Sequence, residues 1–204
     1  MTVAERFLTH HVDNPVPALD GLDLYRTDTA LREAVAREGA AWADADLAAF
    51  GAIAGGEMMG LGFTANENRP RLKAFDRVGR RLDEVEFHPA YHRLMQLGMQ
   101  HGVHAYAWRH AERPGAHVAR AALLFMHYQA DSGTCCPLTM THAVVPALRQ
   151  APALAEAWLP RVGAFSYDPR SVPAADKTGC TIGMGMTEKQ GGSDVRANTT
   201  QALR

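Results

Sequence analysis

The sequence predicts a mainly α-helical fold, with strand structure only near the end of the chain. Apolar residues recur at helical spacing between residues 29 and 159, and Thr, Asp and Pro stand where helices would begin. Beyond residue 179 the pattern changes to small and β-compatible residues followed by a Gly-rich loop. A chain of 204 residues makes one large domain or two small ones and can bury a core.

The first predicted helix follows an irregular N-terminal stretch. Residues 1 to about 28 contain Pro15 and Pro17 and few periodic apolar positions. Thr27-Asp28-Thr29 supplies N-cap side chains, and apolar residues follow at helical spacing until Gly39. We therefore expect an extension over residues 1–28 and a helical domain that begins at residue 29.

The next segments alternate between helices and connections. An Ala- and Gly-rich stretch from Asp44 to about Gly62 predicts closely packed helix, and residues 66–81 read as a polar connection. His88-Pro89 begins a helix towards Val103. Further helices are expected over residues 116–131, from Pro137 to Leu148, and over 153–159 before Pro160, with a loop over 168–177.

The most informative stretch lies within residues 180–195. Cys180 to Met186 reads as a strand, and it leads into a loop in which Thr187 and Ser193 flank the Gly191-Gly192 pair. Adjacent glycines let backbone N–H groups approach a planar or anionic ligand, and hydroxyls both donate and accept hydrogen bonds. Such a loop suits the edge of a heterocycle together with a phosphate. The alternative is an ordinary turn, because Gly-Gly-Ser-Asp is common turn chemistry.

Residues 176–204 are expected to be the beginning of a β-domain. One strand cannot close a sheet, so we expect residues 1–204 to be the N-terminal portion of a longer protein, with a helical domain over 29–175.

Composition excludes several classes of protein. Lys and Arg number 21 against 22 Asp and Glu, so bulk charge does not indicate a nucleic-acid surface. Three cysteines, two of them adjacent, suggest free thiols in a reducing compartment. The N-terminus lacks the apolar core of a signal peptide, and no apolar run of about 18 residues predicts a membrane span. We therefore expect a cytoplasmic protein that does not associate with membranes.

We interpret the remaining histidine, cysteine, tryptophan and basic residues as structural rather than functional. The pairs His88/His92 and His101/His104 share helix faces, but no HExxH or CxxC pattern accompanies them, so capping and partly buried roles are favoured and no metal site is expected. Cys135-Cys136 reads as a small buried hydrophobe rather than a redox pair, and the tryptophans read as core anchors. The basic run from Arg69 to Arg81 is diluted by carboxylates and reads as a solvated connection.

Several motifs resemble the acyl-CoA dehydrogenase superfamily of flavoproteins. Thr187-Glu188 followed by Gly192-Ser193-Asp194 is similar to that superfamily's flavin-loop signature. Lys189-Gln190 replaces the proline-containing version of ordinary members, which favours the AidB, or alkylation-response, branch. Six further segments resemble the same branch: Leu24 to Asp28, Glu33 to Ala40, Gly79 to Val85, Phe87 to His92, Cys136 to Thr141 and Ile182 to Asp194.

The resemblance implies a helical domain followed by a small β-domain, and FAD as the cofactor. The implied FAD-binding residues are Met184, Gly185, Met186, Thr187, Gly191, Gly192 and Ser193. Thr187 is the candidate for contacting the flavin near N1 or O2, and Thr139 and Thr141 are candidates for facing the site. No catalytic residue is assigned within the chain, because the family's catalytic glutamate would lie beyond it.

The implied partners are FAD, an acyl-CoA-like substrate and copies of the same protein, as a tetramer. DNA would be bound only through a C-terminal part that follows this chain. The implied activity is FAD-dependent oxidation of acyl-CoA-like substrates. The alternatives are a DNA-protective flavoprotein whose FAD is structural, and a helical module for oligomerisation built on the Ala- and Gly-rich region.

Overall fold

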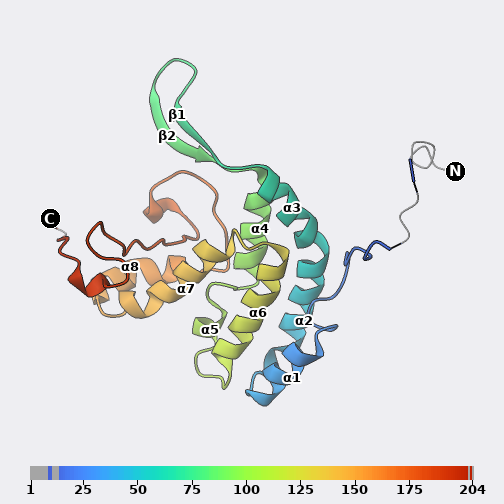
Figure 1. Cartoon of the computed structure of the whole chain (residues 1–204). Coiled ribbons are helices and arrows are strands. Elements are labelled where there is room, and N and C mark those ends of the chain that lie inside the picture. The colour runs from blue at the N-terminus through green and yellow to red at the C-terminus, as the bar shows by residue number, and fades with distance from the viewer. Residues whose placement is uncertain (1–8, 11–13, 202, 204) are drawn as a thin grey trace.

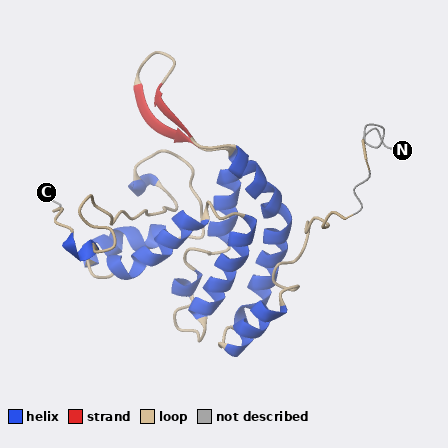
Figure 2. Ribbon diagram, in the orientation of Figure 1, coloured by secondary structure: helices blue, strands red, loops and turns tan. Residues whose placement is uncertain are grey.

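The computed structural model describes residues 9–10, 14–201 and 203, and in these residues helices form most of the regular structure (Figure 1, Figure 2). The helices are α1 (Thr29–Arg37), α2 (Asp44–Ile53), α3 (Met59–Glu67), α4 (Pro89–Gln100), α5 (Tyr106–Arg109), α6 (Ala116–Ala130), α7 (Cys135–Leu148) and α8 (Pro152–Val162). The strands are β1 (Arg71–Phe75) and β2 (Arg81–Glu86). Shorter helical segments are η2 (Ala41–Ala43), η3 (Ala54–Met58), η4 (Ala174–Asp176) and η5 (Val195–Ala197). The mainly α-helical fold class predicted from the sequence is confirmed.

Local side-chain chemistry sets where the helices begin. The Asp28 carboxylate accepts a hydrogen bond from the Leu31 N–H at 2.8 Å and so caps α1. His88 caps α4 by accepting from the Ala90 N–H, with Pro89 as the first helical residue. The predicted N-termini of these two helices are therefore confirmed, as is the capping role expected for His88.

Helix α6 forms the centre of the core. It packs against α1, α2, η3, α3, α5 and α7, and its buried Leu123 and Met126 meet the side chains of the surrounding helices. The fully buried large apolar residues around it are Leu47, Phe50, Met58, Leu94, Met95, Met99 and Leu138. Burial of this apolar surface is the main favourable term holding the helices together.

The N-terminal extension packs against α2 and η3 through two glycines. The Leu24 N–H donates to the Gly51 carbonyl at 3.1 Å, and the Gly21 N–H donates to the Gly55 carbonyl at 3.0 Å. A Cβ on Gly55 would lie 1.7 Å from the Leu22 carbonyl oxygen. The π-helical turn of η3 thus accommodates a second backbone at close range, and these small residues serve packing within the chain.

One helical run has the length and composition of a membrane span. The run Ala41–Glu67 has 27 residues and contains an 18-residue window with a mean hydropathy of 1.2, although no such span is expected from the sequence. Its apolar window is 44% buried inside the molecule, and α2, η3 and α3 pack against α6. These contacts are those of a core helix, and its hydropathy reflects packing against its neighbours.

The polar connection predicted over residues 66–81 is wrong, because residues 71–86 form an antiparallel hairpin that projects from the helices (Figure 1). Leu72 pairs with Val85, and Asp76 accepts hydrogen bonds from the turn N–H groups of Val78 and Arg80 at 2.8 Å. Charged and apolar residues alternate in both strands, which is a pattern typical of strands. Because the stretch contains so many charged residues, it was interpreted as a polar connection instead.

The strand predicted from Cys180 to Met186 is also not formed. Within residues 163–201 the chain runs without any ladder of backbone hydrogen bonds. A strand exists only when a second strand pairs with it, and none of the described residues supplies one here. The last helix, expected to stop before Pro160, continues to the buried Val162.

Candidate functional site

The segment that follows Gly179 is held on helix α7. The Ile182 N–H donates to the Thr141 hydroxyl at 3.0 Å, and the Met184 N–H lies 3.3 Å from the Met140 sulfur. The Cys180 N–H donates to the Arg161 carbonyl at 3.2 Å, which ties the same segment to α8. Two helices therefore position the chain immediately before the candidate flavin loop.

The loop itself closes as a tight turn. The Glu188 N–H donates to the Gly191 carbonyl at 2.8 Å, and the Gly191 N–H donates back at 3.3 Å. The Asn198 amide donates to the Met186 carbonyl at 2.5 Å, and a Cβ on Gly191 would lie 2.3 Å from Asn198 Oδ1. Only glycine fits at Gly191, and Asn198, which the sequence analysis did not single out, closes the loop.

The structure brings all seven predicted FAD-binding residues into this loop and leaves most of them exposed. Gly191 is buried, whereas the other six are open: Met184, Gly185, Met186, Thr187, Gly192 and Ser193. Nothing lies within 4 Å of the place where a Cβ on Gly185 would stand. In the part of the chain that the structure describes, the N–H groups of Thr187, Gly192 and Ser193 donate to no protein group. The loop thus offers free donors on an unobstructed backbone, which fits a planar cofactor with an anionic group.

Glu188 is the carboxylate of this loop, but its chemistry is not that of a base. Its oxygen accepts hydrogen bonds from the Thr199 N–H at 3.3 Å and from the Gln190 amide. A hydrogen bond from Thr200 is the largest of the contacts that lower the pKa of Glu188. A carboxylate held in its ionised form in this way is a poor proton acceptor at neutral pH.

The two threonines of α7 have different surroundings. Thr141 is fully buried, donates to the Pro137 carbonyl at 2.7 Å and accepts from Ile182, so it supports the segment from beneath. Thr139 accepts from the Arg120 guanidinium at 3.3 Å. Arg120 is buried, and among the described residues no carboxylate forms an ion pair with it.

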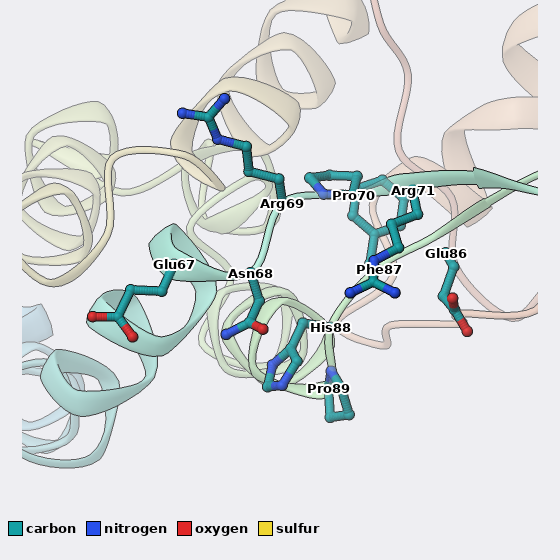
Figure 3. A pocket seen from close by; sticks show the side chains of 9 residues that line it. All are labelled: Glu67, Asn68, Arg69, Pro70, Arg71, Glu86, Phe87, His88 and Pro89. Carbon is teal, nitrogen blue, oxygen red and sulfur yellow. The ribbon is translucent and has the colours of Figure 1, made fainter.

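Two cavities lie near the base of the hairpin. The first, of about 520 Å³, is lined by residues that end α3 and follow it, Glu67, Asn68 and Arg69, and by residues between β2 and α4, including Glu86 and His88 (Figure 3). Arg69 points away from the other labelled side chains (Figure 3). None of the candidate flavin-loop residues lines this cavity.

The second cavity, of about 540 Å³, opens at the N-terminal end of α7. Its wall combines the rings of Phe87 and Tyr91 with Pro137, Thr134 and Asp131. Apolar walls with a few polar groups are typical of sites for small organic ligands.

A buried hydrogen-bonded chain stands behind this second cavity. The Thr134 hydroxyl donates to Asp131 at 2.5 Å and lies 2.7 Å from His127 Nε2. Burial lowers the pKa of His127 to about 4, so the imidazole is neutral and donates to Thr134. The sequence analysis missed this arrangement, although His127 and Asp131 are one helical turn apart and Thr134 follows in the next cap.

The described histidine and cysteine side chains have structural contacts. Among the described residues, no three His, Cys, Asp or Glu side chains are grouped as metal ligands. His92 Nδ1 lies 2.7 Å from the Tyr167 hydroxyl, and His104 Nε2 lies 3.0 Å from the Ala164 carbonyl. Cys135 is a free buried thiol, and burial raises its pKa to about 12, so it is not a nucleophile.

Comparison with known structures defines the class of this fold. A solved chain described as "Bd2924 apo-form" superposes with a TM-score of 0.77 at 25% identity, covering 92% of this chain and 37% of the other. The Caenorhabditis elegans protein ACDH-11, solved in complex with C11-CoA, superposes with a TM-score of 0.75 at 23% identity, covering 100% of this chain and 35% of the other. The helical body therefore has the N-terminal fold of acyl-CoA dehydrogenases.

Sequence comparison gives the particular family. Residues 14–169 match the model of the adaptive response protein AidB N-terminal domain. The chain is 49% identical over 199 residues to the putative acyl-CoA dehydrogenase AidB of Escherichia coli (strain K12), covering 96% of this chain. It is 30% identical over 152 residues to acyl-CoA dehydrogenase family member 11 of Caenorhabditis elegans, covering 74% of this chain. The chain belongs to the AidB family of acyl-CoA dehydrogenase-like proteins, and it spans 37% and 24% of these two relatives.

Proposed function

We propose that this chain supplies the helical module and one cofactor-contacting loop of an FAD-dependent, acyl-CoA dehydrogenase-like oxidoreductase. The observation that carries the proposal is the exposed loop from Met184 to Ser193. Among the described residues the N–H groups of Thr187, Gly192 and Ser193 have no partner, and nothing lies within 4 Å of a Cβ on Gly185. When bound, FAD would accept a hydride from the substrate.

The residues of this chain would bind and orient the cofactor. We expect the Thr187 hydroxyl and N–H to hydrogen-bond the polar edge of the flavin. The N–H groups of Gly192 and Ser193, which pair with no described residue, would bind an anionic group. Thr141 and Asn198 would hold the loop in position from the protein side. Donors fixed in advance lose little free energy in reorganising when charge develops on the ring.

The cavity at the N-terminal end of α7 is the proposed place for the acyl part of an acyl-CoA-like substrate. Phe87, Tyr91 and Pro137 supply apolar walls, and the cavity lies at the end of the helix that supports the flavin loop. The α-proton would be removed by a carboxylate elsewhere in the whole protein, because Glu188 is already engaged.

A chimera tests the proposal. The part of the E. coli relative that aligns with this chain is replaced by residues 1–204, and bound flavin is measured by absorbance in the chimera and in the unmodified relative. We expect the chimera to retain FAD, and Thr187→Val to weaken FAD binding by about fivefold, the cost of one hydrogen bond of about 1 kcal/mol. Thr181→Val, which removes an exposed hydroxyl that forms no hydrogen bond with any described residue, is the control.

A folded chimera that takes up no FAD, beside a relative that does, would show that the loop does not suit the cofactor. Unchanged affinity in Thr187→Val would show that this hydroxyl points elsewhere.

A further inference from the structure

Two polar groups of the cavity at the N-terminal end of α7 have no hydrogen-bonding partner among the described residues. One is the Tyr91 hydroxyl, which bonds to none of them. The other is Asp131 Oδ1, because both protein donors to this carboxylate bind its second oxygen, Oδ2. Both residues line the cavity, which has a volume of about 540 Å³. The cavity therefore offers one donor and one acceptor to a ligand.

The Asp131 carboxylate is held in a fixed orientation. Its Oδ2 accepts hydrogen bonds from the Thr134 N–H at 2.8 Å and from the Thr134 hydroxyl at 2.5 Å. The same hydroxyl accepts from His127 Nε2 at 2.7 Å, and both Thr134 and His127 are buried. A group whose orientation is fixed beforehand loses little freedom when a ligand binds. Asp131 Oδ1 is therefore a preorganised acceptor at the cavity wall.

The Tyr91 hydroxyl is a donor close to this acceptor. Burial, and after it the negative charge of Asp131, raises the pKa of Tyr91, so the phenol keeps its proton at neutral pH. The two groups line one cavity without bonding to each other. A ligand group that satisfies both must donate to the carboxylate and accept from the phenol.

The charges around the cavity favour a neutral ligand group. Arg69 also lines the cavity and forms no ion pair with a described carboxylate, as is true of Asp131 and the described cations. A ligand ammonium would meet the like charge of Arg69, and a ligand carboxylate would meet that of Asp131. The ring of Phe87 stacks on that of Tyr91 at 4.2 Å and provides an apolar wall for the hydrocarbon part of a ligand.

We propose that the acyl group bound in this cavity carries a hydroxyl, which donates to Asp131 Oδ1 and accepts from the Tyr91 hydroxyl. This inference rests on the proposed function, which places the acyl part of the substrate here, and it adds the chemical class of that acyl group. A hydroxyl is the smallest neutral group that donates and accepts at one atom. A site built to bond a hydroxyl discriminates against the analogue that lacks it, because its own polar groups are then left unpaired.

The 204-residue chain itself tests the inference, because every residue that lines the cavity belongs to it. Nuclear magnetic resonance titration measures the Kd of hexanoyl-CoA and of derivatives with one hydroxyl at successive carbons beyond the reacting α and β positions. We expect the best hydroxylated derivative to bind about tenfold more tightly than hexanoyl-CoA. The derivative with an amino group at that same carbon is expected to bind no more tightly than hexanoyl-CoA.

Tyr91→Phe keeps the ring and removes only the hydroxyl, so it should reduce the preference to about twofold without weakening the binding of hexanoyl-CoA. Asp131→Asn should also reduce it, with circular dichroism as the check on folding. Tyr128→Phe is the matched control, because its hydroxyl bonds to no described residue and lies outside the cavity.

Equal binding of the hydroxylated and plain thioesters would overturn the hydroxyl while leaving the acyl assignment of the cavity intact. A preference that survives in Tyr91→Phe, or a stronger preference for the amino derivative, would overturn it as well. A chain that binds none of these thioesters would overturn both the acyl assignment and this inference, whereas the retention of FAD is measured separately in the chimera.

Discussion

The Thr141 hydroxyl accepts a hydrogen bond from the Ile182 N–H at 3.0 Å and donates its own proton to the Pro137 carbonyl at 2.7 Å. A single buried side chain thereby connects the first turn of α7 to the segment that carries the candidate flavin loop. The methyl group of threonine packs in the same place that valine would fill, so the hydroxyl can be removed almost without changing the shape of the side chain.

Thr141→Val is predicted to release this segment while the helices stay folded. Loss of the hydroxyl leaves the partly buried Ile182 N–H without its acceptor, at a cost of about 1–3 kcal/mol, whereas the Pro137 carbonyl can still accept a hydrogen bond within α7. Hydrogen exchange should accelerate at the Ile182 and Met184 amides and stay unchanged in α4 and α6. Thr181→Val is the control, and equal protection of the segment in the two variants would contradict the anchoring role.

Gly55→Ala is predicted to displace the N-terminal extension and destabilise the chain by more than about 2 kcal/mol, because the new Cβ would lie 1.7 Å from the Leu22 carbonyl oxygen. Gly56→Ala is a matched control one residue away, where nothing lies within 4 Å, and it should stabilise the helix by about 0.5–1 kcal/mol. Urea unfolding of both variants checks the prediction. Equal stability changes of the same sign would mean that the extension does not approach this turn.

Stability is predicted to fall as the pH drops from about 6.5 towards 4. Burial lowers the pKa of His104 and His127 to about 4, whereas an imidazole in the unfolded chain has its ordinary pKa of 6.5. In this window the unfolded chain binds protons that the folded chain does not, so each histidine costs up to about 1.4 kcal/mol per pH unit. Above pH 6.5 both imidazoles are neutral in the folded and in the unfolded chain, so they no longer make the free energy of unfolding depend on pH.

Urea unfolding measured across that pH range in the chain and in His127→Gln checks this prediction. The glutamine amide can still donate to Thr134 but does not titrate, so the slope of stability against pH should decrease. The exposed His117→Gln serves as the control for the loss of a histidine as such. A slope that is unchanged in His127→Gln would mean that this imidazole titrates normally in the folded chain.

The chain alone is predicted to bind duplex DNA weakly at physiological salt. Its formal net charge is -1, and four acidic residues accompany the cations of the hairpin, so few counterions would be released on binding. Fluorescence anisotropy with a labelled duplex, at several salt concentrations, measures this. Tight, steeply salt-dependent binding that Arg77→Gln with Arg80→Gln abolishes would show the hairpin to be a nucleic-acid surface.

The helices were predictable because their signals are local. Asp28 three residues before Leu31 and His88 directly before Pro89 are caps that act within a few residues, and the structure uses both. The hairpin was missed because alternating Leu72 and Lys73 lie in a highly charged stretch, and its apolar residues are not covered by the described chain. The strand at 180–186 was predicted wrongly because its pattern is local but its existence depends on a distant partner.

For the candidate site, the sequence predicted the residues of the loop but not the contacts that support it. The glycines and hydroxyls of residues 184–193 are read directly from the motif, and the structure gathers them in one exposed loop. Thr141 was named only as a candidate for facing the site, and its contact with Ile182 joins separate elements, as does the contact of Asn198 with Met186. His127, Asp131 and Thr134 lie close together in the sequence, but the burial of His127 and Thr134 depends on how the helices pack. Their roles follow only once the helices are packed.

The arrangement of contacts around α6 also has a consequence for the order of folding. Helices α5, α6, α7 and α8 each pack against the next along the chain, and such short-range contacts form early and fast. The backbone from Gly183 to Thr187, in contrast, is exposed and forms few hydrogen bonds with the described residues. We expect the helical body to form first during synthesis, with this stretch then acting as an open template on which a later strand can be laid.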